Sequence, residues 1–219
     1  MIRPDVLVAW PDHVDYPLFR YQLEKYKDYF HNIIICFTPG IKDRNVELFV
    51  RKVVPTAIFV KPNHIYPDWR QSAILSLLQR SNAGWILFME QDFIIKDKSF
   101  YENILNRSKS MQFIGYKEGD RIHPSFALIK TELLYLTQRD FSAYPERGLD
   151  HFGMFFKELE DLTKFTDIRE LGLKDREDFL HLAGLTQNYH CFREGQPFYK
   201  PDEFLTYNNL VQKLSVPQD

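Results

Sequence analysis

The segment Trp85–Ile95 has the sequence WILFMEQDFII, and it decides how the rest of the chain is interpreted. Its first five residues are large and apolar, and a second apolar run follows Glu90-Gln91-Asp92. Such a run predicts a central strand that is buried on both faces. Residues i and i+2 of an extended chain point the same way, so Glu90 and Asp92 could share one divalent metal ion. The alternative is that the strand ends at Met89 and both acids are solvated.

The composition indicates one folded α/β domain of 219 residues, 44% of them hydrophobic. A net charge of −2 gives no electrostatic basis for binding nucleic acid. The apolar runs are far shorter than the roughly 18 residues of a membrane span, so we expect no transmembrane segment. The N-terminal sequence has no secretory pattern, and two cysteines fit a reducing compartment. We therefore expect a cytoplasmic protein, and peripheral attachment to a membrane is the alternative.

Strands and helices are expected to alternate along the first half of the chain. Apolar runs predict strands at 5–10, 32–37, 56–60 and 85–89, and helical stripes predict helices near 17–30, 46–53 and 73–83. Further strands are expected at 112–116 and 125–129, and helices near 100–105, 131–137 and 152–162, with Thr131 as the cap of the second of these. A late apolar segment covers 179–185.

This alternation predicts a mostly parallel central sheet flanked by helices, with the ligand outside the carboxyl ends of the strands. We assign residues 1–195 to the domain and residues 196–219, which are more polar, to a surface extension.

The order of these pieces resembles a glycosyltransferase of the GT-A fold, most like the family 2 type. In that family an Arg-Asn pair opens a helix, and a buried strand then leads into an Asp-x-Asp motif. Here Arg70-Gln71 and Glu90-Gln91-Asp92 occupy these places. The segment HPSFALIKTELL (123–134) resembles the family's acceptor-side segment. The segment GLDHFG (148–153) resembles the start of its catalytic helix, and FLHLAGLTQNY (179–189) resembles a region with a metal-binding histidine.

The resemblance implies a GT-A-like nucleotide-diphospho-sugar transferase that moves a hexosyl-type sugar to a carbohydrate or glycoconjugate acceptor. It also implies inversion at the transferred carbon and dependence on Mn²⁺ or Mg²⁺. The implied metal ligands are Asp92, Glu90 and His181, because carboxylate and imidazole groups suit these ions when phosphate completes the ligand set. His190 is the rival of His181.

Further roles follow from the same resemblance. Arg70 would bind the diphosphate, to which its guanidinium offers a fork of donors. Trp10 and Asp12, at the end of the first strand, would contact the nucleotide. Asp150 would be the base that takes the proton of the acceptor hydroxyl, with Glu146 as the alternative. Asp150 is also placed to cap a helix that begins near His151.

Two other functions stay open. A sugar nucleotidyltransferase would usually carry a Gly-rich or basic phosphate loop after the first strand, and VAWPDHVDYP has neither Gly nor Lys. A non-catalytic carbohydrate or nucleotide-sugar binding protein on a degenerate transferase fold is the other alternative. The chain departs from the family motifs by Glu90 in place of Asp and by Gln71 in place of Asn.

Overall fold

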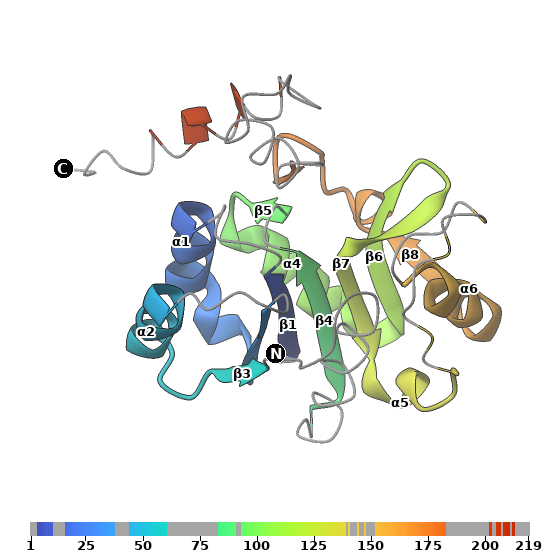
Figure 1. Cartoon of the computed structure of the whole chain (residues 1–219). Helices are drawn as coiled ribbons and strands as arrows, with labels where there is room; N and C mark the ends of the chain where they lie inside the picture. The colour runs from blue at the N-terminus through green and yellow to red at the C-terminus, as the bar shows by residue number, and fades with distance from the viewer. Residues whose placement is uncertain are drawn as a thin grey trace.

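The structure is a computed structural model that describes residues 4–10, 16–37, 44–60, 83–90, 93–138 and 152–182, with isolated residues between 140 and 147 and between 202 and 212. These parts form one seven-stranded sheet, one two-stranded sheet and the helices around them (Figure 1). The predicted helix near 73–83 and the boundary at 195 lie outside the described residues.

The large sheet is mostly parallel, as the sequence predicts. Its strands are β1 (Asp5–Trp10), β2 (Ile33–Phe37), β3 (Ile58–Val60), β4 (Trp85–Glu90), β6 (Phe113–Glu118), β7 (Arg121–Lys130) and β8 (Phe165–Asp167). They lie in the order β3-β2-β1-β4-β7-β6-β8. Strand β7 is antiparallel to both of its neighbours, and every other pairing is parallel. The parallel strands therefore end at one common edge, which is uppermost in Figure 1.

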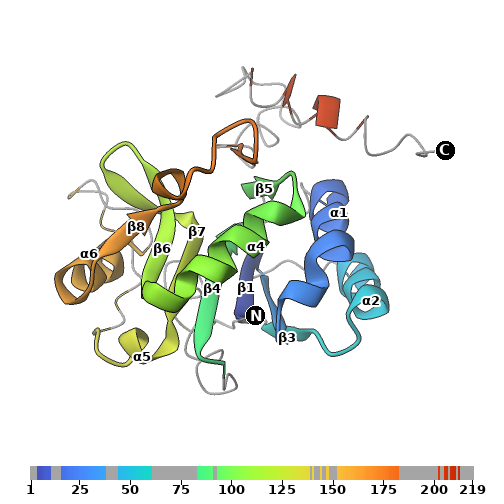
Figure 2. The same ribbon diagram turned by 180° about the vertical axis from the view of Figure 1, so that it is seen from behind.

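Helices cover both faces of this sheet. One face packs against α1 (Tyr16–Tyr26), α2 (Arg44–Val53) and α4 (Lys98–Arg107), and the other packs against α5 (Thr131–Leu134) and α6 (Gly153–Leu162). Figure 2 shows α4 crossing the sheet, on the side away from the viewer of Figure 1. Short 3-10 turns extend α1 and α4 as η1 (Lys27–Tyr29) and η2 (Ser108–Ser110), and η4 (Ile168–Leu171) follows β8.

Strand β4 shows why the sheet sits at the centre of the molecule. Its side chains alternate between the faces, so Leu87 and Met89 join the core beneath α4, while Ile86 and Phe88 join the core beneath α6. All five residues from Trp85 to Met89 are buried, and Glu90 is half-buried. The expectation of a strand buried on both faces is confirmed.

A small second sheet lies beyond the carboxyl ends of the parallel strands. It consists of β5 (Phe93–Ile95) and β9 (Phe179–His181), which pair antiparallel with Phe93 opposite His181. Strand β5 follows β4 after two residues, whereas β9 comes from the far end of the described domain. In Figure 1 β5 lies near the upper end of α1.

Several local expectations are corrected. Thr131 does not cap α5: the N-cap is Lys130, and the Thr131 hydroxyl instead donates to the Ala83 carbonyl at 2.6 Å. Helix α6 begins at Gly153, close to its expected start, but its N-cap is Phe152 in the left-handed region and it has no side-chain cap, so the expectation of Asp150 as the cap is wrong. Strand β7 is longer at both ends than predicted. Within the described parts of the chain, none of the helices has the length and apolarity to cross a bilayer.

Candidate metal centre

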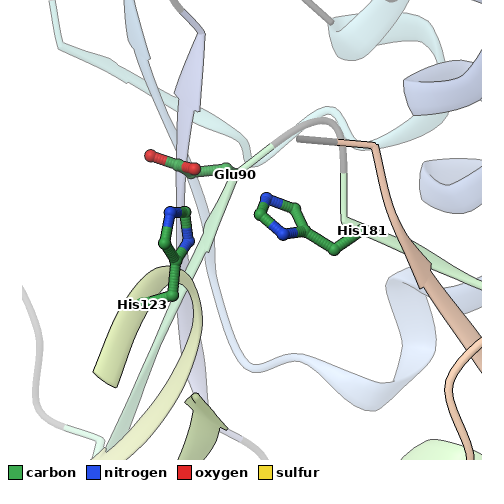
Figure 3. Close-up of side chains that lie close together, drawn as sticks. All are labelled: Glu90, His123 and His181. Atoms are coloured by element: carbon green, nitrogen blue, oxygen red, sulfur yellow. The ribbon is translucent and has the colours of Figure 1, made fainter. Parts of the chain in front are cut away.

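Three side chains from separate elements converge at the carboxyl edge of the sheet. Glu90, His123 and His181 each present one ligand atom, and these atoms lie within 4.8 Å of one another. Figure 3 shows the carboxylate and the two imidazole rings facing a shared space. Both histidines are buried, each 8% exposed. Nitrogen and oxygen atoms at this spacing could coordinate one ion.

Glu90 owes its position to the length of β4. The apolar run is paired with β1 on one side and with β7 on the other, and Glu90 is its last residue. Its partner on β1 is Ala9, so Trp10 lies one residue farther along the same edge. The carboxylate therefore leaves the sheet where ligands of parallel α/β sheets bind.

His123 reaches Glu90 because β7 bulges. Gly115 of β6 pairs with Ala127, but the next residue, Tyr116, pairs with His123. The residues between them, Pro124 to Phe126, have no partner on β6, although Phe126 still pairs with Met89 of β4. Proline lacks an N–H and is found within sheets at bulges, so Pro124 fits this break. A bulge of this kind redirects the side chains beside it.

His181 is the last residue of β9, and aromatic rings hold it from several directions. Its ring centroid is 4.6 Å from that of His123, 5.4 Å from that of Tyr116 and 6.3 Å from that of Phe93. Tyr116 meets the His181 ring edge-on, at 71°. The imidazole is thus packed against apolar rings on the protein side and faces Glu90 on the other.

Two polar groups lie next to the His123 ring. The backbone N–H of Ser125 donates to Nδ1 at 3.2 Å, and Nε2 lies 3.6 Å from Glu118 Oε2. Nδ1 therefore binds an ion only if it releases the Ser125 N–H.

Tyr116 separates the histidines from a charged cluster. The Arg169 guanidinium lies 5.5 Å from the Tyr116 ring and is held by Asp167 through hydrogen bonds of 2.6 and 2.9 Å. Burial raises the pKa of Tyr116, and the nearby carboxylates of Asp175 and Glu118 raise it further. The phenol is therefore neutral at physiological pH, and its ring acts as a wall of the site.

The donor set fits a divalent transition metal. Two imidazoles and one carboxylate leave room for water or substrate in the remaining positions, as in catalytic zinc sites. Manganese accepts the same nitrogen and oxygen donors, whereas magnesium is usually bound through oxygen. Ser125 lies in the bulge beside His123, and its buried hydroxyl has no hydrogen-bond partner among the residues that the structure describes.

The predicted site residues are placed unequally by the structure. The structure brings Glu90 and His181 into one cluster, and the backbone of Trp10 lies at the same edge. The sequence interpretation missed His123, whose signal was a Pro directly after it inside a strand. The remaining predicted residues lie outside the described residues: Asp12, Arg70, Asp92 and Asp150, with the alternatives Glu146 and His190.

A surface cavity lies at the opposite edge of the sheet. It has a volume of about 320 Å³ and is lined in part by Gln112, Lys130 and Thr163. Lys130 pairs with Trp85, the first residue of β4, whereas Glu90 is the last residue of that strand. This cavity is therefore separate from the metal centre.

Comparisons with known proteins identify the fold. A scan against protein-family models gives no match, and a search of curated proteins gives none either. Solved structures do match. A proposed nucleotide-diphospho-sugar transferase from Desulfovibrio desulfuricans G20 is similar with a TM-score of 0.56 and 13% identity, over 99% of this chain and 100% of that one.

Two other solved structures are similar. The mannosyltransferase PcManGT from Pyrobaculum calidifontis, solved with GDP-Man and Mn²⁺, has a TM-score of 0.54 and 15% identity over 76% of this chain. The match spans 55% of the mannosyltransferase's own length. The 2-C-methyl-D-erythritol 4-phosphate cytidylyltransferase from Thermus thermophilus has a TM-score of 0.56 and 10% identity, over 96% of this chain and 100% of that one. This chain therefore has the GT-A-like fold of nucleotide-diphospho-sugar transferases.

Proposed function

We propose that this protein is a metal-dependent glycosyltransferase that moves a sugar from a nucleotide-diphosphate donor to an acceptor hydroxyl. The observation that carries the proposal is the convergence of Glu90, His123 and His181 at the ligand-binding edge of this fold. Fold alone does not determine function, so the argument depends on the donor atoms of the site. The likeness to a mannosyltransferase solved with Mn²⁺ agrees with it.

The preferred ion in this proposal is Mn²⁺. The sequence expectation allowed Mn²⁺ or Mg²⁺ and counted only one histidine. A second imidazole lowers the suitability of Mg²⁺, which prefers an octahedral shell of oxygen atoms. Asp92 is the further carboxylate ligand in this proposal, since it follows Glu90 by two residues.

When bound, the ion acts as a Lewis acid on the leaving diphosphate. The protein's own residues bind and orient the donor around it. Arg70 hydrogen-bonds diphosphate oxygens, Trp10 stacks on the base, and Asp12 binds the nucleotide after β1. Arg70→Ala should weaken donor binding several-fold while the melting temperature changes by a few degrees at most.

Asp150 is the proposed base. Its neighbour in the chain, Phe152, packs on Phe88 with ring centroids 5.4 Å apart, and Phe88 precedes Glu90 by two residues on β4. Asp150 precedes Phe152 by two residues in the sequence. Phe152 also has a φ of 69°, which is strained for a bulky residue and occurs most often near functional sites. Asp150→Asn should reduce transfer by about 10²–10⁴-fold with donor binding retained.

The decisive experiment measures release of nucleoside diphosphate from a panel of nucleotide-diphosphate sugars. Mn²⁺, Mg²⁺ and Zn²⁺ are compared with EDTA, and acceptors range from water to simple glycosides. Metal-dependent release that Glu90→Gln abolishes is the expected result. Glu132→Gln is the matched control, because Glu132 pairs with Lys130 at the opposite edge. Absence of release with every donor and ion would contradict the enzyme and favour the non-catalytic binding protein.

A nucleotidyltransferase is the second candidate, because the cytidylyltransferase is as similar in fold as the proposed sugar transferase. The absence of Gly and Lys in VAWPDHVDYP argues against it. The same samples, given a nucleoside triphosphate and a sugar phosphate, distinguish the two. Release of pyrophosphate would identify a nucleotidyltransferase, and we expect none.

A further inference from the structure

We infer that Gln22 of α1 is a positioning residue of the metal centre, because its buried amide holds the small sheet that carries His181. This inference rests on the proposed function in one respect: its test measures binding of the ion that the proposed function requires. Gln22 lies far from the site in sequence, and the sequence pattern gave no reason to single it out.

Gln22 pairs with β5 as a strand would. Its side-chain Nε2 donates to the Phe93 carbonyl at 3.0 Å, and its Oε1 accepts from the Ile95 N–H at 3.0 Å. The residue is only 2% exposed. Both the donor and the acceptor of the amide are thus used. Both hydrogen bonds are shielded from water, and a polar group that loses its partner in such a buried place is costly.

The amide occupies the edge of β5 that β9 leaves open. The N–H and C=O of one strand residue point to the same edge, and consecutive residues alternate between the edges. Phe93 and Ile95 therefore direct their groups to Gln22, while Ile94 directs its groups to β9. It follows that Phe93 and His181 form a non-hydrogen-bonded pair, in which side chains lie closest together. The Gln22 amide replaces the missing third strand.

The small sheet needs this support, because an isolated two-stranded sheet is marginal in water. Helix α1 adds two more contacts on the same side. The Tyr26 hydroxyl donates to the Ile95 carbonyl at 3.1 Å, and the Lys25 ammonium donates to the Lys96 carbonyl at 3.0 Å. Gln22 differs from these two, because among the three it is the residue that binds Phe93, the first residue of β5, which pairs with His181.

The position of His181 therefore depends on two contacts in series. Gln22 holds the outer edge of β5 at Phe93 and Ile95. On the other edge of β5, Ile94 pairs with Leu180 of β9, the strand that ends at His181. Groups that orient the ligands of a metal site typically change its affinity by about 10–100-fold when they are removed. A buried amide that served only the core would change stability and leave ion affinity unaltered.

The test compares Gln22→Leu with the parent protein and with Thr131→Val. Thr131→Val removes another hydrogen bond between side chain and backbone, a partly buried one at the opposite edge of the sheet. Mn²⁺ affinity is measured by calorimetry and electron paramagnetic resonance. Exchange of the Leu180 amide proton is measured by hydrogen–deuterium exchange followed by NMR. We expect Gln22→Leu to bind Mn²⁺ at least about tenfold more weakly and to exchange the Leu180 amide at least about tenfold faster. Thr131→Val should match the parent in both.

Equal Mn²⁺ affinity and equal exchange in Gln22→Leu and the parent would overturn the inference. Equal losses in Gln22→Leu and Thr131→Val would do the same, because the effect would then be general destabilisation. If the parent binds no Mn²⁺, the proposed metal centre fails, and the exchange rate alone decides whether Gln22 holds β9. If Gln22→Leu does not fold, Gln22→Met, which keeps an unbranched chain of similar length, takes its place.

Discussion

Gly115 illustrates how one residue controls the candidate site. It is the last residue of β6 before the register shift that brings His123 opposite Tyr116. A Cβ at this position would lie 3.0 Å from the Phe126 backbone oxygen and 3.1 Å from the Phe165 ring. The oxygen has little freedom to move, because Phe126 is also held in the ladder with Met89.

Gly115→Ala should therefore destabilise the fold by about 1–3 kcal/mol through overpacking. Urea unfolding followed by circular dichroism gives the free energy. The control is Gly84→Ala, because a Cβ at Gly84 meets no atom within 4 Å. Its free energy of unfolding should stay within about 0.5 kcal/mol of the parent. A Gly115→Ala protein as stable as the parent would show that the bulge adapts.

At the same scale, the sequence predicted Glu90 and His181 for different reasons. Glu90 was predicted because a carboxylate at the end of a buried strand needs a partner such as a metal ion. His181 was predicted from the resemblance to a glycosyltransferase family. His123 could not be predicted in this way, because its role depends on a bulge between β6 and β7. Pro124 was the only local sign, and a Pro in an apolar run also fits an edge strand or a strand start.

Among the elements, η4 and β8 form a second support beneath the site. Asp167 closes a capping box with Glu170 and accepts hydrogen bonds from the Arg169 backbone at 2.8 Å and the Lys117 backbone at 3.2 Å. Burial raises the pKa of Asp167, but hydrogen bonds from the side chain and backbone of Arg169 lower it more, so it lies below its ordinary value. The charged carboxylate therefore stabilises the folded protein.

This depressed pKa predicts a pH dependence with a definite sign. Asp167→Asn should cost about 1–3 kcal/mol at pH 7, where the parent carboxylate is charged. The contribution is complete above the unfolded pKa of about 3.9 and is lost as the pH falls through the lower folded pKa. The stability difference between parent and variant should thus shrink below about pH 4.

Urea unfolding at a series of pH values checks this prediction. Asp161→Asn is the control, since Asp161 is exposed on α6 and should leave the curve of the parent unchanged. A difference between Asp167→Asn and the parent that stays constant down to about pH 3 would show that folding does not lower the pKa of Asp167.

Elements with strong local patterns were predicted well. Strand β4 has a continuous apolar run, and α4 has its stripe, with an Asp97 side chain that accepts from the Ser99 N–H at 2.8 Å. The pairing of β5 with β9 was not predicted, because three residues of alternating or apolar character do not specify a distant partner. The cap of α6 was misassigned to Asp150, since the N-cap is Phe152, whose left-handed conformation is uncommon for a bulky residue.

At the scale of the whole molecule, the candidate centre unites three distant parts of the chain. Glu90 ends a parallel strand, His123 belongs to the one reversed strand of the sheet, and His181 belongs to the small sheet. Bringing them together requires the complete fold. The unfolded chain therefore has no such site. An ion that binds the assembled site must stabilise the folded state.

Binding of Mn²⁺ should accordingly raise the melting temperature. At a free concentration of a hundred times the dissociation constant, the added stability is about 2.7 kcal/mol. For a domain of this size each kcal/mol corresponds to roughly 2–4 °C, so the expected rise is about 5–11 °C. Differential scanning calorimetry measures it with Mn²⁺, with Mg²⁺ and with EDTA.

Because the site offers two imidazoles, Mg²⁺ at the same concentration should produce a smaller rise. Glu90→Gln and His181→Gln should both remove most of the Mn²⁺ effect, whereas Glu132→Gln should keep it. An equal rise in all of these variants would mean that the ion binds elsewhere on the protein, and the three converging side chains would then have a structural role only.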